Sequence, residues 1–519
     1  MDDNNTSSPL VTESDRGEHQ SCLEDTIEKY IGDFGWSQLF QVVIVSLVWI
    51  FDSQQAFISI FTDAQPSWHC VPPLAHNLCN SNICLLPKNS WSWDLPPHTS
   101  IVSEWSLECA GSVISSMPAS SFYMGSFAGG FVLVGLADSS FGRKNTMLLS
   151  CLVMSLAGIL ATVSTNIWVY STFRFISGFG RANIGTCSLV LSSELVGKRW
   201  RGQSGTAGFF MFTVGFLSLP VIAYMNKESS WREIYLWTCV PAVLYCILVY
   251  FLVKESPRWL FVQGRKEEFV RTLKSIAPTN KANNLTLASI SNMSFEQKFE
   301  TTDIYYALKT FFKRKWAIRR LITLMILGFG VGLVYFGMPL GVANLNFDIY
   351  LSTALNALME LPAAMIIFII IGKAKRRTAV LGFSMLCAIS SLMCALTGSS
   401  RWKGFQVAIE LMSFFSVCTA FDVLLIYTLE LFPTCIRNSA VTIVRQMMIF
   451  GGATSPLLVA IGRGKGAISY WVFGLTIGIC GHFVWCLPET KGETLCDTMD
   501  EEESKETRRK PTSLTTEGV

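Results

Sequence analysis

Residues 321–341 read LITLMILGFGVGLVYFGMPLG and contain no charged side chain. About 20 consecutive apolar residues are enough for a helix to cross a bilayer, so this stretch predicts a transmembrane helix. The whole chain shares this character: half of its 519 residues are hydrophobic and 15% are charged, against roughly 25% charged in a soluble domain. The chain is therefore predicted to be an all-α, polytopic membrane protein. A net charge of +3 is too small to indicate a polyanionic partner, so we expect no nucleic-acid binding.

Twelve such apolar blocks can be counted, six before residue 254 and six after residue 320. They cover residues 39–61, 115–137, 145–165, 167–192, 204–224, 233–253, 321–341, 347–371, 378–398, 405–429, 439–462 and 467–487. A polar stretch separates the two sets, which predicts two six-helix halves joined by a linker.

Basic residues fix the expected orientation, because cytosolic loops are enriched in Lys and Arg. The stretch from Lys254 to Arg320 holds 14 of them, whereas the segment 62–111 holds only Lys88. Both termini and the linker are therefore predicted to be cytosolic. The expected organisation is a cytosolic segment 1–38, a first half 39–253 with an extracytosolic loop 62–111, a linker 254–320, a second half 321–487 and a cytosolic tail 488–519.

The extracytosolic loop contains Cys70, Cys79, Cys84 and Cys109. Four cysteines in an oxidising compartment predict two disulfides, with three possible pairings. The first apolar block follows a polar, acidic segment, so we expect it to be a retained span and not a cleaved leader.

Several motifs occur at predicted helix ends. The loop between the second and third blocks reads GLADSSFGRK (135–144), and the fourth block contains RFISGFG (174–180). Both resemble signatures of the major facilitator superfamily, whose fold has 12 transmembrane helices in two six-helix halves and a substrate site near the midplane between them. The first departs from the usual pattern, because one residue is inserted before Gly142 and Ser139 replaces a basic residue.

More specific strings are SEWSLEC (103–109), KESPRWL (254–260), VYFGM (334–338), LMELPA (358–363), YTLELFPTCIRN (427–438) and LPETKGE (487–493). In this order they resemble the organic ion transporter family of that superfamily. The strings FDSQQ (51–55) and WHC (68–70) resemble its plant organic cation/carnitine branch.

The resemblance implies a carrier for small organic cations or zwitterions, such as carnitine, choline-like compounds or polyamines, with protons as a second partner. The alternatives are a proton-coupled sugar or organic anion carrier, and a receptor-like sensor on a carrier scaffold. The chain has no Walker A motif, metal-ligand spacing or nucleophile elbow, so we expect no enzyme activity, metal or cofactor. We expect a monomer, in the vacuolar membrane in preference to the plasma membrane.

Ionisable residues inside spans are costly and are usually functional. Asp52 and Arg174 are predicted at similar depths, and we expect them to form a proton-coupling pair or a fixed structural pair. Arg181 lies seven residues after Arg174, on the same helix face, and lines the cavity or binds backbone carbonyls. Cationic side chains there favour the anion or sugar alternative.

Glu360 falls near the midplane of the eighth block, where a carboxylate can balance a cationic ligand. Tyr335 and Phe336 match the family's substrate-facing aromatic motif, and aromatic rings hold quaternary ammonium groups by cation–π attraction. Trp49 is a further substrate-binding candidate. Phe210 and Phe450 are weaker ones.

Asp422 and Arg445 lie at similar distances from the loop that joins their blocks, which predicts a structural ion pair. Arg445 also favours the anion alternative. The family often carries a selectivity-setting charge at the position that matches Ile449, which is neutral here.

Charged residues at the cytosolic helix ends are expected to latch neighbouring helices together. They are Asp138, Arg143, Lys144, Glu194, Arg201, Glu255, Arg258, Glu430 and Arg437.

Overall fold

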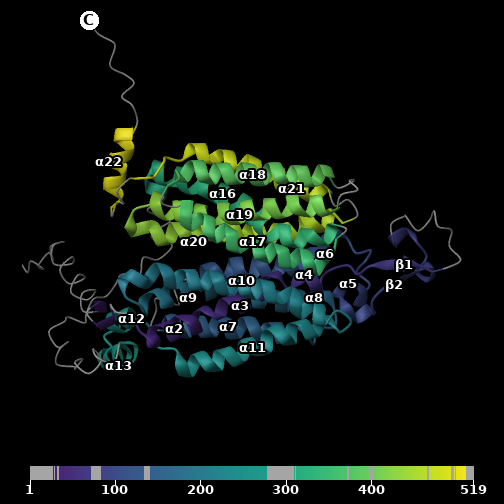
Figure 1. The fold of residues 1–519 in the computed structure, drawn as a ribbon, viewed down its shortest axis with the longest axis horizontal. Coiled ribbons are helices and arrows are strands. Elements are labelled where there is room, and N and C mark those ends of the chain that lie inside the picture. The colour runs from purple at the N-terminus through teal and green to yellow at the C-terminus, as the bar shows by residue number, and fades with distance from the viewer. Residues whose placement is uncertain are drawn as a thin grey trace, which may run out of the picture.

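The computed structural model describes residues 27–28, 30–31, 34–71, 83–133, 141–277, 309, 311–345, 347–370, 373–397, 403–463, 467–492, 496 and 498–509. Its elements are almost all helices, and they form two layers that lie side by side (Figure 1). The first layer, purple to teal, contains the helices before residue 254. The second, green to yellow, contains those after residue 314.

The first half begins with one interrupted helix and continues with five more passes. Its elements are α2 (Trp36–Ser46), α3 (Val48–Phe57), α4 (Ser59–Thr62), α6 (Ser112–Val132), α7 (Arg143–Ala161), α8 (Ile167–Arg181), α9 (Ile184–Glu194), α10 (Arg201–Met225) and α11 (Trp231–Leu252). The second half contains α16 (Lys315–Gly341), α17 (Ile349–Ile370), α18 (Arg376–Leu396), α19 (Lys403–Leu431), α20 (Thr434–Ile461), α21 (Ala467–His482) and the 3₁₀ turn η8 (Phe483–Cys486).

Each of the twelve predicted blocks coincides with one of these helical passes. Ten described helices are long and apolar enough to cross a membrane by themselves. The second and fourth passes are outside that set for clear reasons. Serine is frequent in α6, and the fourth pass is divided between α8 and α9 at Ala182 and Asn183.

The two ends of the helical layers carry different structures (Figure 1). We call one the loop end, because the 62–111 segment projects from it with β1 (Trp68–Cys70), β2 (Trp91–Trp93) and α5 (Ile101–Glu104). The other is the linker end, which carries α12 (Pro257–Val262), α13 (Lys266–Ile276) and α22 (Met499–Arg509). Strand β1 pairs antiparallel with β2, with Trp68 opposite Trp93.

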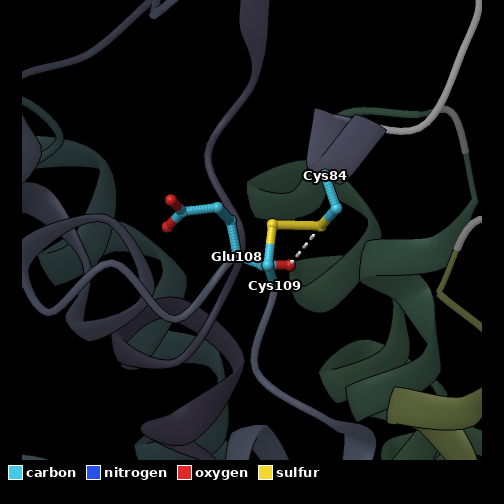
Figure 2. The surroundings of a disulfide bond; sticks show 3 residues. All are labelled: Cys84, Glu108 and Cys109. Carbon is cyan, nitrogen blue, oxygen red and sulfur yellow. Dashed lines mark hydrogen bonds between the residues drawn. A yellow bond between two sulfur atoms is a disulfide. The ribbon is translucent and has the colours of Figure 1, made fainter. Parts of the chain in front are cut away.

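Three of the four loop cysteines predicted to form disulfides are disulfide-bonded in the structure. Cys84 and Cys109 are bonded, with Cα atoms 5.5 Å apart, and the carbonyl of Glu108 lies 3.5 Å from the Cys84 sulfur (Figure 2). Cys70 is also disulfide-bonded. Cys79 lies outside the described residues. The bond fastens the middle of the loop to the start of the second pass.

The halves meet along two pairs of helices, α6 against α20 and α10 against α17. Within the first half, α6 and α8 pack at backbone distance. A Cβ atom at Gly178 would lie 1.8 Å from the carbonyl oxygen of Phe122, so only glycine fits this crossing. The RFISGFG string therefore has a packing reason as well as a family resemblance.

Candidate substrate site

Glu360 lies where helices of the two halves meet. Its Oε1 accepts a 2.7 Å hydrogen bond from the hydroxyl of Tyr335 on α16, and its Oε2 accepts one of 3.3 Å from Thr213 on α10. Thr213 belongs to the first half, and the other two residues belong to the second. Glu360 forms no ion pair among the described residues, so no cationic side chain there compensates a negative charge on it.

Aromatic rings from both halves form a cluster around Tyr335, which donates to this carboxylate. The cluster comprises Phe57, Tyr123 and Phe216 from the first half and Tyr335, Phe336, Phe414 and Phe421 from the second. The ring of Tyr335 lies 4.8 Å from that of Phe421 and 5.9 Å from that of Phe414. Phe57 contacts Tyr335 and Phe336 across the interface, with centroids 6.5 Å and 6.4 Å apart. A carboxylate among ring faces is suited to a quaternary or protonated amine.

The predicted pair of Asp422 and Arg445 does not form. Asp422 lies on α19 near Glu360 and Tyr335 and acts on both electrostatically, and it makes no ion pair within the described part of the chain. Arg445 points from α20 into the first half, where its Nη1 donates a 2.9 Å hydrogen bond to Thr186. The prediction was wrong because equal depth along two helices does not specify the faces that carry the side chains.

Asp52 pairs with Arg181, and not with Arg174 as predicted. Arg181 Nη2 donates to Asp52 Oδ2 at 3.0 Å, and its Nε lies 2.9 Å from Oδ1. Arg174 donates instead to the Gln55 carbonyl at 3.4 Å and to the Ser59 hydroxyl at 3.1 Å. Both arginines lie over the ring of Phe122, 4.2 Å away for Arg174 and 5.8 Å for Arg181. Proton coupling by Asp52 stays a prediction, with Arg181 as its partner.

The other aromatic candidates differ in their surroundings. Trp49 packs inside the first half, where its indole donates to Ser188 at 3.1 Å. Phe336 belongs to the cluster around Glu360. Phe450 contacts Phe127 across the interface between the halves, and Phe210 is 53% exposed on the outer surface of α10. Phe336 therefore lies next to Tyr335 in this cluster, whereas Phe210 lies on the exposed side of α10.

Several predicted latch residues do tie helix ends together at the linker end. Glu255 accepts hydrogen bonds of 3.1 Å from the backbone N–H groups of Arg143 and Lys144, which begin α7. Burial raises the pKa of Glu255 above its ordinary value, although these hydrogen bonds oppose the shift. The Arg143 side chain lies 3.7 Å from Glu194 at the end of α9. A helix N-terminus favours a carboxylate, which explains this position of Glu255.

Gly142 permits that arrangement. Its φ angle is +87°, which residues with a Cβ atom rarely adopt, and a Cβ here would lie 2.4 Å from Glu255 Oε2. Asp138 lies outside the described residues, so its predicted contact has no counterpart here. Arg201 begins α10 and Arg258 lies in α12, both at the linker end.

The second half repeats the latch with different residues. Glu430, at the end of α19, pairs with Arg376 at the start of α18 (3.0 Å), and Glu489 accepts the backbone N–H of Arg376 at 2.8 Å. The predicted Arg437 instead donates to the carbonyl of Phe432 at 3.2 Å. The two halves thus share one device: a basic residue at a helix start, an acid at a neighbouring helix end and a second acid after the last pass.

A cavity of about 970 Å³ opens between the halves at the loop end. It is lined by Ser59, Asp63 and Ser115 of the first half and by Leu340, Asp348 and Arg463 of the second, among others. Arg463 Nη2 donates to the backbone carbonyl of Asp63 at 3.2 Å, which joins the halves. Phe57 precedes Ser59 by two residues and Phe336 precedes Leu340 by four, so the aromatic cluster adjoins the cavity.

The sequence analysis missed three charged residues, which lie in different parts of the structure. Arg376 was not singled out, although its position at a helix start mirrors that of Arg143. Glu410 was not singled out, although it is a carboxylate inside the block 405–429 and is fully buried. Asp63 lies directly after the first block and lines the cavity. A list of every acid within two residues of a block would have found Glu410 and Asp63.

Comparisons with known proteins agree with this architecture. Residues 78–501 match the family "Sugar (and other) transporter". The chain is 55% identical over 491 residues to organic cation/carnitine transporter 3 of Arabidopsis thaliana, covering 93% of this chain and 94% of that protein. It is 51% identical over 516 residues to organic cation/carnitine transporter 2 of the same plant, covering 97% of each.

Among solved structures, the inward-open xylose transporter XylE from E. coli superposes with a TM-score of 0.63. It shares 18% identity and covers 90% of this chain and 98% of its own length, so it shows the fold alone. The predicted major facilitator fold and the predicted resemblance are both confirmed, and the chain is a multi-pass membrane carrier and not an enzyme. The chain belongs to the sugar (and other) transporter family and, within it, groups with the organic cation/carnitine transporters.

Proposed function

We propose that this carrier moves small organic cations or zwitterions, with Glu360 as the counter-charge of the ammonium group. The observation that carries the proposal is the carboxylate without an ion-pair partner at the junction of the two halves, bonded to Tyr335 and Thr213. A ligand that replaces these bonds would contact α10, α16 and α17 at once. Rocking of the halves would then alternate access to it.

The aromatic cluster supports a positively charged substrate. Tyr335, which donates to the carboxylate, contacts the rings of Phe414 and Phe421. Asp422 is a second buried carboxyl group that acts electrostatically on Glu360. An ammonium group over such faces gains roughly 0.5–2 kcal/mol from cation–π attraction beyond its pairing with the carboxylate.

The arginines that favoured an anion or sugar carrier have other partners. Arg181 is paired with Asp52, and Arg174 is bound to Gln55 and Ser59 and is 1% exposed. Arg445 is bonded to Thr186 in the opposite half. These three arginines therefore bond to partners within and between the halves. The acids of α17 and α19 are then left to determine which substrate charge the site prefers.

We also propose that the loop end is extracytosolic or luminal, that the linker end is cytosolic, that the protein acts as a monomer and that it resides in the vacuolar membrane. The Cys84–Cys109 bond supports an oxidising compartment at the loop end. The basic linker supports a cytosolic position for the opposite end. Accessibility of single cysteines placed at each end, to a reagent that does not cross membranes, checks the orientation.

The test is uptake of labelled tetraethylammonium, carnitine, urate and glucose into proteoliposomes. We expect saturable uptake of tetraethylammonium or carnitine, and at least a tenfold loss with Glu360→Gln. Glu228→Gln makes the same chemical change at an exposed acid in the turn between α10 and α11 and should behave as wild type. Tyr335→Phe keeps the ring and should retain more uptake than Tyr335→Leu. Uptake of glucose or urate alone, or normal cation uptake by Glu360→Gln, would overturn the proposal.

A further inference from the structure

A second carboxylate lies inside the second half, away from the contacts described for Glu360. Glu410 is on α19, seven residues after Lys403 at the loop end, and its side chain is 0% exposed. Its Oε2 accepts one hydrogen bond of 3.2 Å, from the amide of Asn356 on α17. Its Oε1 has no hydrogen-bond partner in the part of the chain that the structure describes.

The groups around Glu410 are polar, buried and incompletely bonded. Asn356, Ser352 and Tyr470 are each 0% exposed, and the Asn356 Oδ1, the Ser352 hydroxyl and the Tyr470 hydroxyl have no partner among the described residues. Asn356 and Ser352 are on α17, and Tyr470 is on α21. Tyr470 interacts electrostatically with Glu410, as does Cys394 on α18.

No Lys, Arg or His side chain bonds to Glu410 in the described part of the chain, and the groups that face it from α17, α18 and α21 are the neutral ones named above. An isolated ionised carboxylate in such surroundings is strongly disfavoured, so the group neutralises. A proton on Glu410 supplies the missing charge. It also makes the carboxyl group, which only accepts hydrogen bonds when ionised, a donor.

The position of Asn356 connects this carboxylate with the proposed substrate site. Asn356 and Glu360 are four residues apart on α17, so they lie on one helix face with Cβ atoms about 5–6 Å apart. Asn356 therefore links the two acids, and two negative charges joined through one buried helix face oppose each other's ionisation. A bound cation that neutralises Glu360 therefore lowers the cost of ionising Glu410, and a proton on Glu410 leaves Glu360 free to carry the negative charge.

The neighbourhood also approaches the cavity at the loop end. The Tyr470 hydroxyl lies 3.4 Å from the position that a Cβ atom of Gly341 would occupy, and the preceding residue, Leu340, lines the cavity. The Tyr470 hydroxyl therefore lies beside the α16 wall of the cavity and also interacts electrostatically with Glu410. It is placed where it can pass a proton when the helices move.

We propose that Glu410, with Asn356 and Tyr470, is a proton-binding site that couples proton movement to cation transport. The proposal rests on the proposed function. When a cation enters the site at Glu360, the proton leaves the Glu410 carboxyl group, and when the cation departs, a proton returns. One positive charge replaces another, so the cycle is an exchange of one proton for one cation.

The test compares wild type, Glu410→Gln, Glu410→Asp and Asp52→Asn in proteoliposomes, with Glu228→Gln as the matched control. Gln copies the protonated acid and cannot release a proton. We expect Glu410→Gln to exchange labelled tetraethylammonium at equal pH within about twofold of wild type and to lose accumulation driven by a pH gradient. Glu410→Asp should recover part of the accumulation. Persistent accumulation in Glu410→Gln, or its loss in Asp52→Asn only, would overturn the proposal.

A spectroscopic measurement keeps the proposal falsifiable if Glu410→Gln fails to fold. Infrared difference spectra with and without tetraethylammonium should show loss of a protonated carboxyl band in wild type and a shifted band in Glu410→Asp. Absence of any carboxyl change in wild type when the cation binds would refute the coupling. If wild type binds no organic cation, the proposed function fails, and a pH titration of the same band still reports whether Glu410 takes up a proton.

Discussion

The pairing of Asp52 with Arg181 makes a sharp quantitative prediction about stability. The two side chains are 3% and 9% exposed and approach to 2.9 Å. At an effective dielectric constant near 20, such a pair attracts by roughly 5 kcal/mol. This attraction offsets the cost of burying both charges, and removal of one partner leaves the other uncompensated, at a cost of about 3–5 kcal/mol.

The perturbations are Asp52→Asn, Arg181→Gln and both together, measured as free energies of unfolding in mixed micelles. We expect each single change to lower the free energy of unfolding by about 3–5 kcal/mol and the double change to cost much less than the sum. The comparison cycle uses Arg174→Gln in place of Arg181→Gln. It should be nearly additive, because Arg174 bonds to Gln55 and Ser59.

The outcome that refutes this reasoning is additivity of Asp52→Asn with Arg181→Gln to within about 0.5 kcal/mol, which would mean that the residues are not energetic partners. A large coupling with Arg174 would instead restore the pairing expected from helix depth. Either result would change which arginine is considered when Asp52 is tested for proton coupling.

Three further outcomes are expected. Gly142→Ala should lower the stability of the linker-end latch by about 1–3 kcal/mol through backbone strain, as unfolding measurements would show, and an unchanged stability would contradict the close contact with Glu255. Mass spectrometry of non-reduced peptides should find Cys84 joined to Cys109, and free thiols at both would contradict it. Burial alone would raise the pKa of Glu104, but hydrogen bonds from Arg232 and Trp231 outweigh it and hold that pKa below its ordinary 4.5. The stability that ionised Glu104 contributes is therefore fully present above pH 4.5 and is lost as the pH falls through the lowered pKa. In unfolding measurements, Glu104→Gln should be less stable than wild type at neutral pH, and the two free energies of unfolding should converge in acid.

The number and limits of the helices follow from the sequence because the bilayer imposes one strong rule. Every backbone polar group must be satisfied inside a span, so a long apolar block has one available structure. The block 321–341 and the helix α16 illustrate this: they end at the same residue, and the helix begins six residues earlier, with Lys315. The extra turn is basic and amphipathic, so hydropathy alone does not report it.

The partners of each buried side chain are predicted less well from the sequence, because they depend on the rotation of each helix about its axis. Depth along the axis changes by 1.5 Å per residue, but the facing direction turns by a full circle in 3.6 residues. Asp422 and Arg445 match in depth and face different neighbours. Glu360 and Tyr335 were predicted by family motifs and do meet, because those motifs record an arrangement that composition does not contain.

The mispairing of Asp52 shows what a sequence can and cannot specify inside a membrane. Arg174 and Arg181 are seven residues apart, so both face the first pass, and either could reach an acid there. The structure assigns the carboxylate to Arg181 and gives Arg174 a carbonyl, a hydroxyl and the face of Phe122. Buried arginine can be satisfied by such neutral partners because it has five donors and a flat face. A carboxylate has only acceptors when it is ionised, so Asp52 needs an arginine, whereas Glu410, without one, needs a proton.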